Sequence, residues 1–114
     1  MITISFSLNL IPGAVLQKIN ASLSDSSSRT CVINLRNGED PFTIPDGCSI
    51  ALEGIKPNKE TFHLDCSIED NKVIAEITND VTDCPGAVIC QLILEQGSKL
   101  LHTSKFIIQV EDLG

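Results

Sequence analysis

The chain has 114 residues, which suits one domain with a hydrophobic core of its own. Hydrophobic residues make up 42% of the sequence and charged residues 20%, a composition that excludes a disordered chain. Eight basic and fifteen acidic residues give a formal net charge of −7, which argues against nucleic acid or an anionic membrane as partner. No apolar run approaches the roughly 20 residues of a spanning helix, and the N-terminus lacks a basic n-region, so we expect no membrane segment and no signal peptide.

Alternation of apolar and polar residues predicts most of the secondary structure. A strand with one buried face places every second side chain in the core, so a period of two indicates a strand. Segment 2–10 shows this period most regularly, with Ile2, Ile4 and Phe6 beginning the apolar face. The same period returns in four later segments, which are 30–35, 48–53, 61–69 and 72–78.

Segment 14–23 fits two patterns. Val15, Ile19 and Leu23 are spaced four apart, as on one face of a helix. With Ala21 included, the segment also comes close to strand alternation. We favour a strand because the other segments of the chain are β-type.

The last two predicted strands, 87–95 and 105–111, are the most apolar. Ile89 and Ile93 fall on the face opposite the core side of the first strand, and Ile107 does so in the second. A strand that is apolar on both faces is central or covered. These isoleucines therefore either lie under another part of the chain or form an exposed patch that binds a partner.

Turn signals separate these segments. The dipeptides 37–38 and 46–47 end in glycine, 70–71 predicts a hairpin between its flanking strands, and 97–98 predicts a second hairpin from Ala87 to Val110. Pro41, Pro45 and Pro57 lack an amide donor and belong in loops or edges. Residues 79–84 allow one turn of helix capped by Asn79. Together these features predict a single all-β domain over residues 1–114, an antiparallel two-sheet β-sandwich of the immunoglobulin-like type with about seven to eight strands.

The five cysteines do not form a recognisable motif. Their number is odd and no C-x-x-C pair occurs, so a zinc ribbon or a redox motif is not predicted. Cys31, Cys66 and Cys90 fall in the apolar phase of their segments, where a reduced cysteine acts as a small buried hydrophobic residue. A disulfide between Cys66 and Cys90 is the alternative, but it requires an oxidising compartment.

Candidate catalytic and metal-binding residues are few. His63 alternates outward on its predicted strand, and His102 falls at a strand end or bulge, so both are expected to be structural. A Cys–His nucleophilic pair lacks a local motif. The acidic residues Asp65, Glu69 and Asp70 lie on one hairpin but do not form a calcium loop. We expect no enzyme activity, no cofactor and no metal, and no catalytic or binding residue is assigned.

Several short motifs follow one another along the chain. They are DSSSRT at 25–30, NG at 37–38, KPN at 56–58, CSI at 66–68, PG at 85–86, CQL at 90–92 and TSKFIIQV at 103–110. Their order resembles the N-terminal domain of baseplate upper proteins from tailed phages of Gram-positive hosts, a domain also found in prophage tail receptor-binding proteins. The resemblance implies a β-sandwich that docks on the tail baseplate. The loop 25–30 is a candidate contact loop or a turn former.

The resembling proteins continue into a helix or fibre where this sequence ends at Gly114, so we expect either a short version or a domain of a longer product. The leading hypothesis is a non-enzymatic assembly module of a phage or prophage tail, made in the host cytoplasm and located in the virion. Its expected partners are other tail or baseplate proteins and further copies of itself. The alternative is an extracellular bacterial immunoglobulin-like adhesion or carbohydrate-binding module.

Overall fold

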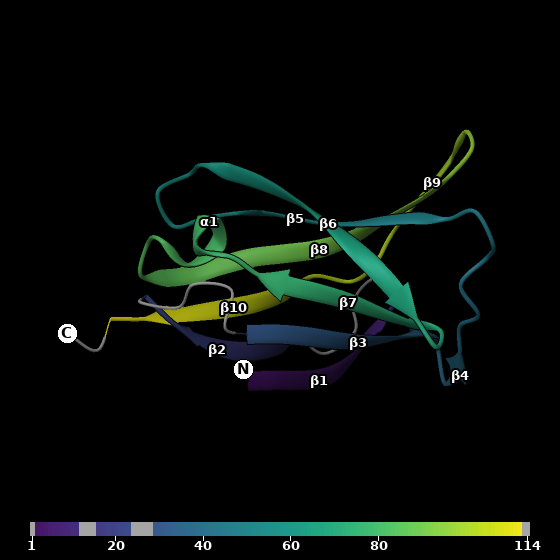
Figure 1. The fold of residues 1–114 in the computed structure, drawn as a ribbon, viewed down its shortest axis with the longest axis horizontal. Coiled ribbons are helices and arrows are strands. Elements are labelled where there is room, and N and C mark those ends of the chain that lie inside the picture. Colours follow the sequence, from purple (N-terminus) through teal and green to yellow (C-terminus); the bar gives the residue numbers. More distant parts are fainter. Residues whose placement is uncertain (1, 12–15, 24–28, 113–114) are drawn as a thin grey trace.

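A computed structural model describes residues 2–11, 16–23 and 29–112, and shows ten strands and one helical turn (Figure 1). The elements are, in chain order, β1 (Ile2–Asn9), β2 (Gln17–Ser22), β3 (Arg29–Asn37), β4 (Asp40–Pro41), β5 (Ser49–Ile55), β6 (Thr61–Glu69), β7 (Lys72–Ile77), α1 (Asn79–Thr82), β8 (Gly86–Gln96), β9 (Lys99–His102) and β10 (Phe106–Glu111). The all-β prediction is confirmed. The strand reading of segment 14–23 is confirmed where the structure describes it, as β2.

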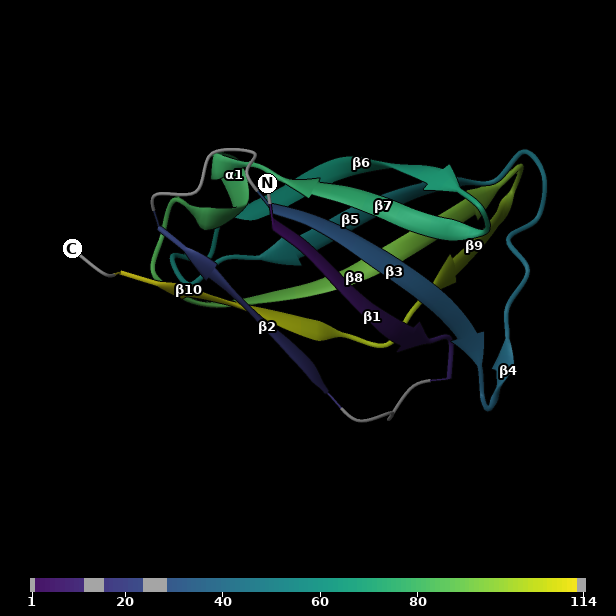
Figure 2. The same ribbon diagram turned by 60° about the horizontal axis from the view of Figure 1, so that its bottom comes forward.

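The strands form one continuous order, β1-β3-β7-β6-β5-β8-β10-β2, with β4 beside β3 and β9 beside β8. The sheet curls until its two ends approach each other, so that it is nearly closed and barrel-like (Figure 2). The predicted immunoglobulin-like sandwich of two sheets is not confirmed by this order. The prediction of purely antiparallel pairing is wrong, since β1 lies parallel to β3 and β2 lies parallel to β10.

β6 makes the order continuous because its two halves have different partners. The first part, from Thr61 to Cys66, pairs with β5, whereas Ser67 to Glu69 pair with β7. A strand that changes partner along its length joins two sheets that would otherwise only face each other. Alternation along β6 gives no sign of this exchange, and for that reason the sequence predicts the strand but not its bridging position.

The core lies inside the curled sheet and is built from the predicted apolar faces. Phe106 of β10 is fully buried and packs against Phe6 of β1, with ring centroids 5.2 Å apart. The other buried side chains come mainly from β3, β7, β8 and β10, and include Ile33, Val73, Val88, Leu92 and Ile108. Ile68 was expected on the buried face of its segment but is 39% exposed, because it lies where β6 leaves β5.

The hairpin predicted at residues 70–71 is confirmed and also fastens a distant loop. Asp70 and Asn71 both have positive φ angles, 50° and 60°, as a tight turn between twisted strands requires. The Asn71 side chain accepts a hydrogen bond from the Ile44 N–H at 2.8 Å and donates one to the Phe42 carbonyl at 3.0 Å. The turn residue therefore positions the segment that follows β4.

The predicted final hairpin is interrupted. β8 pairs first with β10 and then with β9 on the same side, and the residues between these two strands leave the sheet. Thr103 bridges the interruption, since its N–H donates to the Leu92 carbonyl and its hydroxyl accepts from the Leu92 N–H, both at 3.0 Å. This break and the two-residue β4 explain why the structure has more strands than predicted.

The helical turn α1 is held from outside by a buried lysine. Lys56 is 6% exposed, and its Nζ donates to the Asp80 carbonyl at 3.0 Å and to the Asp83 carboxylate at 3.1 and 3.2 Å. The hydrogen bond with the Asp83 carboxylate raises the pKa of the lysine, against a smaller opposing effect of desolvation. The predicted cap at Asn79 is wrong, because the N-cap is Thr78 and its side chain makes no capping bond. Among the described residues no helix is long and apolar enough to cross a membrane.

Candidate functional site

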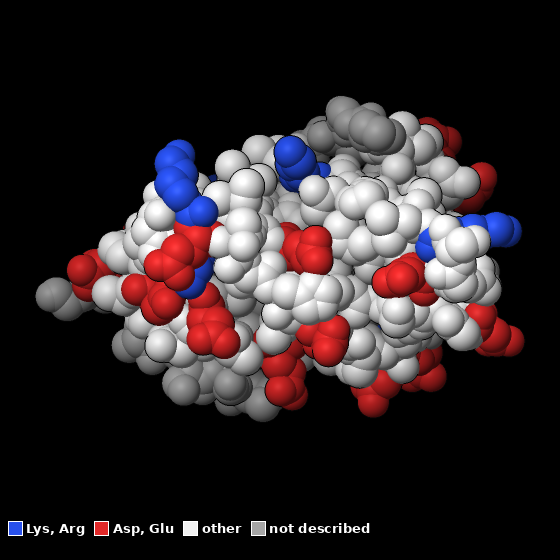
Figure 3. All heavy atoms as spheres, turned by 90° about the horizontal axis from the view of Figure 1, so that it is seen from above, with Lys and Arg blue, Asp and Glu red and all other residues white. Residues whose placement is uncertain are grey.

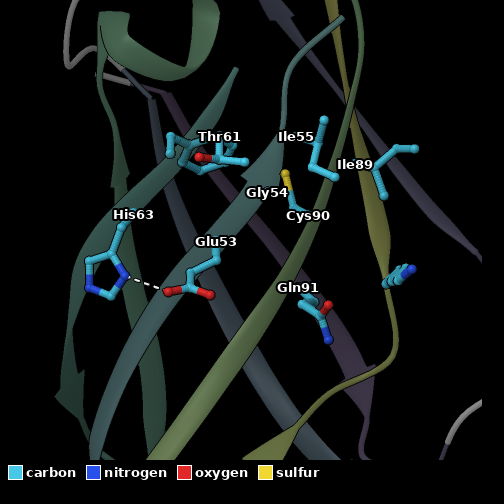
Figure 4. Close-up of a pocket in the computed structure, with 10 residues that line it drawn as sticks. Glu53, Gly54, Ile55, Thr61, His63, Ile89, Cys90 and Gln91 are labelled. Carbon is cyan, nitrogen blue, oxygen red and sulfur yellow. Dashed lines mark hydrogen bonds and ion pairs between the residues drawn. The ribbon is translucent and has the colours of Figure 1, made fainter. Parts of the chain in front are cut away.

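The outer face of β6, β5 and β8 carries a hollow of about 540 Å³ (Figure 4). It is lined by residues of these three strands and by Lys105, which precedes β10. The lining residues are Glu53, Gly54, Ile55, Thr61, Phe62, His63, Ile89, Cys90, Gln91 and Lys105. The hollow is open to solvent and combines an apolar part with a polar part.

The apolar part is a row of isoleucines on three neighbouring strands, which we call the isoleucine row. The strand register places Ile55 of β5 opposite Ile89 of β8, and Ile89 opposite Ile107 of β10. Ile55 and Ile89 are 50% and 46% exposed, and Ile107 is partly buried. The sequence predicted an outward position for Ile89 and Ile107, and the structure places them there with no covering layer among the described residues.

Ile55 was missed at the sequence level, although the signal for it was present. Ile55 lies two residues after Glu53 and therefore on the same, outward face of β5. The buried Ile50 and Leu52 lie on the opposite face. The predicted strand ended before it. Ile93, predicted to share this face, is partly buried and lies opposite Ala51, one step beyond the polar residues of the hollow.

The polar part is centred on His63, which is 58% exposed as the sequence predicted. Its Nδ1 lies 2.6 Å from Glu53 Oε2 and its Nε2 lies 3.2 Å from Asp65 Oδ1. A neutral imidazole has only one N–H, so both bonds to carboxylates form only when the ring is protonated. The hydrogen bond with Glu53, followed by that with Asp65, raises the pKa of His63 against a smaller opposing effect of desolvation.

A second hollow of about 300 Å³ adjoins the first on the same face and contains the other histidine. His102 ends β9 and is exposed, as expected for a strand end. The register places it opposite Ile93, and Glu95 and Leu100 lie nearby in the same hollow. Both histidines therefore lie on one face, which the sequence did not indicate because they are far apart in the chain.

The arrangement does not support a Cys–His nucleophilic pair. Cys90 shares the hollow with His63, but its thiol is almost fully buried and its Sγ donates to the Val88 carbonyl. Burial raises the pKa of Cys90, which keeps it as a thiol rather than the nucleophilic thiolate. The ring nitrogens of His63 are both occupied by carboxylates.

All five cysteines are free. Cys31 and Cys66 lie in or against the same core as Cys90, as their phase predicted. Burial raises the pKa of Cys31 to about 12 and that of Cys66 to about 11. These thiols are packing residues and have little thiolate character.

The remaining candidates do not converge on a site. Among the described residues, no group of three or more histidine, cysteine and acidic side chains could hold a metal ion. Glu69 and Asp70 are exposed at the β6–β7 turn, beyond the hollow that contains Asp65. The candidate contact loop 25–30 lies outside the described residues except for Arg29 and Thr30 at the start of β3.

The β8–β9 hairpin projects from the rest of the sheet (Figure 1). Its residues line part of a third hollow of about 310 Å³, which is mainly apolar. Leu100 and Leu101 of β9 are 58% and 43% exposed, and Phe42 and Pro45 form the opposite wall. The sequence alone does not predict the exposure of these leucines, because β9 is too short to show a clear alternation.

Asp and Glu outnumber Lys and Arg on the side of the molecule that carries β5 and β6 (Figure 3). Lys56, one of the eight basic residues, is buried and paired. The exposed groups of this side therefore have the acidic character of the whole sequence.

Fold and surface together define an all-β domain with a nearly closed sheet, open surface hollows and free strand edges. Among solved structures, the N-terminal domain of phage TP901-1 ORF48 has a similar fold. The match covers 97% of this chain and 99% of that domain, with a TM-score of 0.76 and 12% sequence identity. No family model and no curated protein sequence matches the chain.

Proposed function

We propose that this chain is a non-enzymatic structural module of a phage or prophage tail baseplate, where it docks to another tail protein and helps position the host-binding parts. The observation that carries this proposal is the fold shared with the ORF48 domain over nearly the whole of both chains. The order of motifs in the sequence supports it independently, because it resembles phage baseplate proteins.

The isoleucine row is the surface proposed for docking. Ile55 and Ile89 are about half exposed side by side, and Ile107 extends the row to β10. Burying apolar surface contributes about 25 cal/mol of favourable free energy per Å². Part of this free energy offsets the entropy lost on association. Glu53 and His63 flank the row and would orient a partner through polar contacts.

The location is tested by immunogold electron microscopy of tail particles from the strain that encodes this chain. Gold at the distal end of the tail supports the proposal, and the absence of the chain from purified particles overturns it. A strain from which the gene has been deleted serves as the antibody control.

The docking surface is tested in the same particles by complementing the deletion with variants. Ile89→Glu places a charge in the middle of the isoleucine row and should reduce the amount of chain recovered in purified particles at least tenfold. Ile68→Glu is the matched control, because Ile68 is 39% exposed on β6 and lies outside the row. Equal recovery of both variants would show that docking uses another surface.

A further inference from the structure

Acidic side chains gather beside the isoleucine row, over β5 and β6. Three hollows adjoin one another on this side, because His63 lines all of them. Two are the hollows that contain the two histidines, and the other, of about 330 Å³, is lined by residues of β6 and α1. The acidic residues that line the three hollows are Glu53, Glu60, Asp65, Asp80, Asp83 and Glu95.

Few positive charges balance these carboxylates. Two lysines line the same hollows, Lys56 and Lys105. Lys56 is 6% exposed and is already bound to the Asp83 carboxylate. Lys105 is exposed but lies on the β10 side of β8, whereas Glu53 lies opposite Gln91 on the β5 side. The surface over β5 and β6 is therefore acidic, as Figure 3 shows.

The carboxylates of Glu53 and Asp65 keep acceptor capacity beside their contacts with His63. Glu53 is 44% exposed and Asp65 is 93% exposed. His63 contacts one oxygen of each group, Oε2 of Glu53 and Oδ1 of Asp65. A carboxylate has two oxygens that can each accept more than one hydrogen bond. Both groups can therefore accept charge-assisted hydrogen bonds from the guanidinium or ammonium group of a partner.

The apolar and the acidic groups have the spacing of alternate side chains on a strand. Glu53 and Ile55 lie two residues apart on β5, which is about 6.6 Å along a strand. Ile89 lies opposite Ile55, and His63 lies opposite Glu53 (Figure 4). In an extended partner segment, an aliphatic residue on the isoleucine row thus places a basic residue two positions away within reach of Glu53.

We propose that the partner docking here presents a basic, apolar segment, whose aliphatic side chain covers the isoleucine row while a neighbouring lysine or arginine binds Glu53 and Asp65. Charge complementarity favours this partner, because an uncharged or acidic segment would desolvate the carboxylates without supplying a cation. A second copy of this chain is disfavoured by its own formal charge of −7. This assignment of the partner rests on the proposed docking function.

Three ten-residue peptides test the chemistry of the partner in NMR titrations of the purified full chain. Each peptide has isoleucine at two alternate positions of a serine and glycine background, followed in the same alternation by two arginines, two serines or two glutamates. The arginine peptide should bind about tenfold more tightly than the other two and shift the signals of Glu53, His63 and Ile89. Its binding should weaken as salt is added. Equal binding of the three peptides, or a preference for serine or glutamate, overturns the proposal.

Matched variants show whether the carboxylates select the peptide. Glu53→Gln combined with Asp65→Asn removes both charges at nearly unchanged size and should abolish the advantage of arginine. Glu69→Gln removes a carboxylate of β6 that does not line the hollows, and it should bind like the wild type. Circular dichroism and thermal unfolding verify that the variants are folded. An arginine advantage that persists in the double variant overturns the proposal.

The experiments separate this proposal from the tail assignment. Signals of the isoleucine row that shift with the concentration of the chain alone would place a second copy on this face and overturn the basic partner. A chain that is present in tail particles but binds the three peptides alike refutes the basic partner and leaves the proposed function standing. A chain that is absent from the particles refutes the proposed function, and the peptide titration then still decides which segment this face binds.

Discussion

At the residue scale, His63 links protonation to stability. Its pKa is raised above the ordinary value of 6.5 in the folded state, mainly by the hydrogen bond with Glu53. A raised pKa means that the folded state holds the proton more tightly, so the stabilisation is full below about pH 6.5 and is lost as the pH rises through the folded pKa. The residue is exposed, so the effect on stability is small.

We expect an NMR titration to give His63 a pKa above the ordinary value of 6.5. Glu53→Gln should move the His63 pKa downward. In parallel, the difference in melting temperature between wild type and His63→Gln should be largest in mildly acidic solution and shrink on the alkaline side. A His63 pKa at or below 6.5 would contradict the double carboxylate contact.

The cysteines give a second residue-scale prediction. Cys31 and Cys90 are buried, and Cys48, Cys66 and Cys84 are partly exposed. Desolvation raises the pKa of Cys31, Cys66 and Cys90. A thiol-specific colorimetric reagent should therefore modify two thiols quickly in the folded protein and all five after denaturation. Cys48→Ser combined with Cys84→Ser is the control and should abolish the fast phase. Rapid modification of the core thiols would show that the packing is looser than described.

Gly54 lies where its neighbours leave no room for a Cβ atom. A Cβ at this position would lie 2.4 Å from the Ile89 carbonyl oxygen and 2.7 Å from the Phe62 ring, which covers the glycine on the neighbouring strand. Gly54→Ala should therefore destabilise the domain by about 2 kcal/mol in a denaturant titration, the cost of overpacking a filled site. Ser49→Ala on the same strand should change stability by no more than about 0.5 kcal/mol. Equal stabilities would argue against the tight β5–β8 contact.

At the scale of elements, α1 depends on Lys56 more than on its own sequence. The helix has one turn and no side-chain cap, and a turn this short is not stable in isolation. Lys56, at the end of β5, supplies donors to the Asp80 carbonyl and the Asp83 carboxylate. The turn is therefore positioned by a residue more than twenty positions earlier in the chain.

Lys56→Met keeps the aliphatic stem and removes the donors. The variant should melt at a lower temperature, and the amides of Val81 and Thr82 should exchange faster, because the Asp80 carbonyl and the Asp83 carboxylate lose the donor that holds the turn. Lys59→Met removes an exposed lysine from the same loop and should behave like the wild type. Unchanged exchange in α1 would show that the ammonium contacts do not hold the turn.

At the same scale, alternation predicted most strands and the faces they bury. It placed Ile33 and Leu92 in the core and His63 outside, because side-chain direction on a strand depends only on position along that strand. It missed β4, and it predicted an uninterrupted final hairpin where the structure has two separate strands, β9 and β10. Two residues are too few to show a period, and the interruption at Thr103 depends on contacts with Leu92.

At the scale of the whole molecule, the surface face that unites the isoleucine row with both histidines comes from the strand order. β6, β5 and β8 are neighbours, so Glu53, His63 and Ile89 meet although they come from separate segments. The same order leaves β1 and β2 at its ends.

By itself, the sequence indicated an acidic all-β chain, the inward faces of most strands and core positions for Cys31, Cys66 and Cys90, because composition and period-two alternation are local properties. Only the tertiary structure decided the nearly closed order, the two parallel pairings, the double carboxylate contact of His63 and the isoleucine row. Alternation is the same in a parallel and an antiparallel strand and does not encode which strand lies beside it. These features arise from hydrogen bonds and packing between distant segments, which form only when the whole sheet closes around its core.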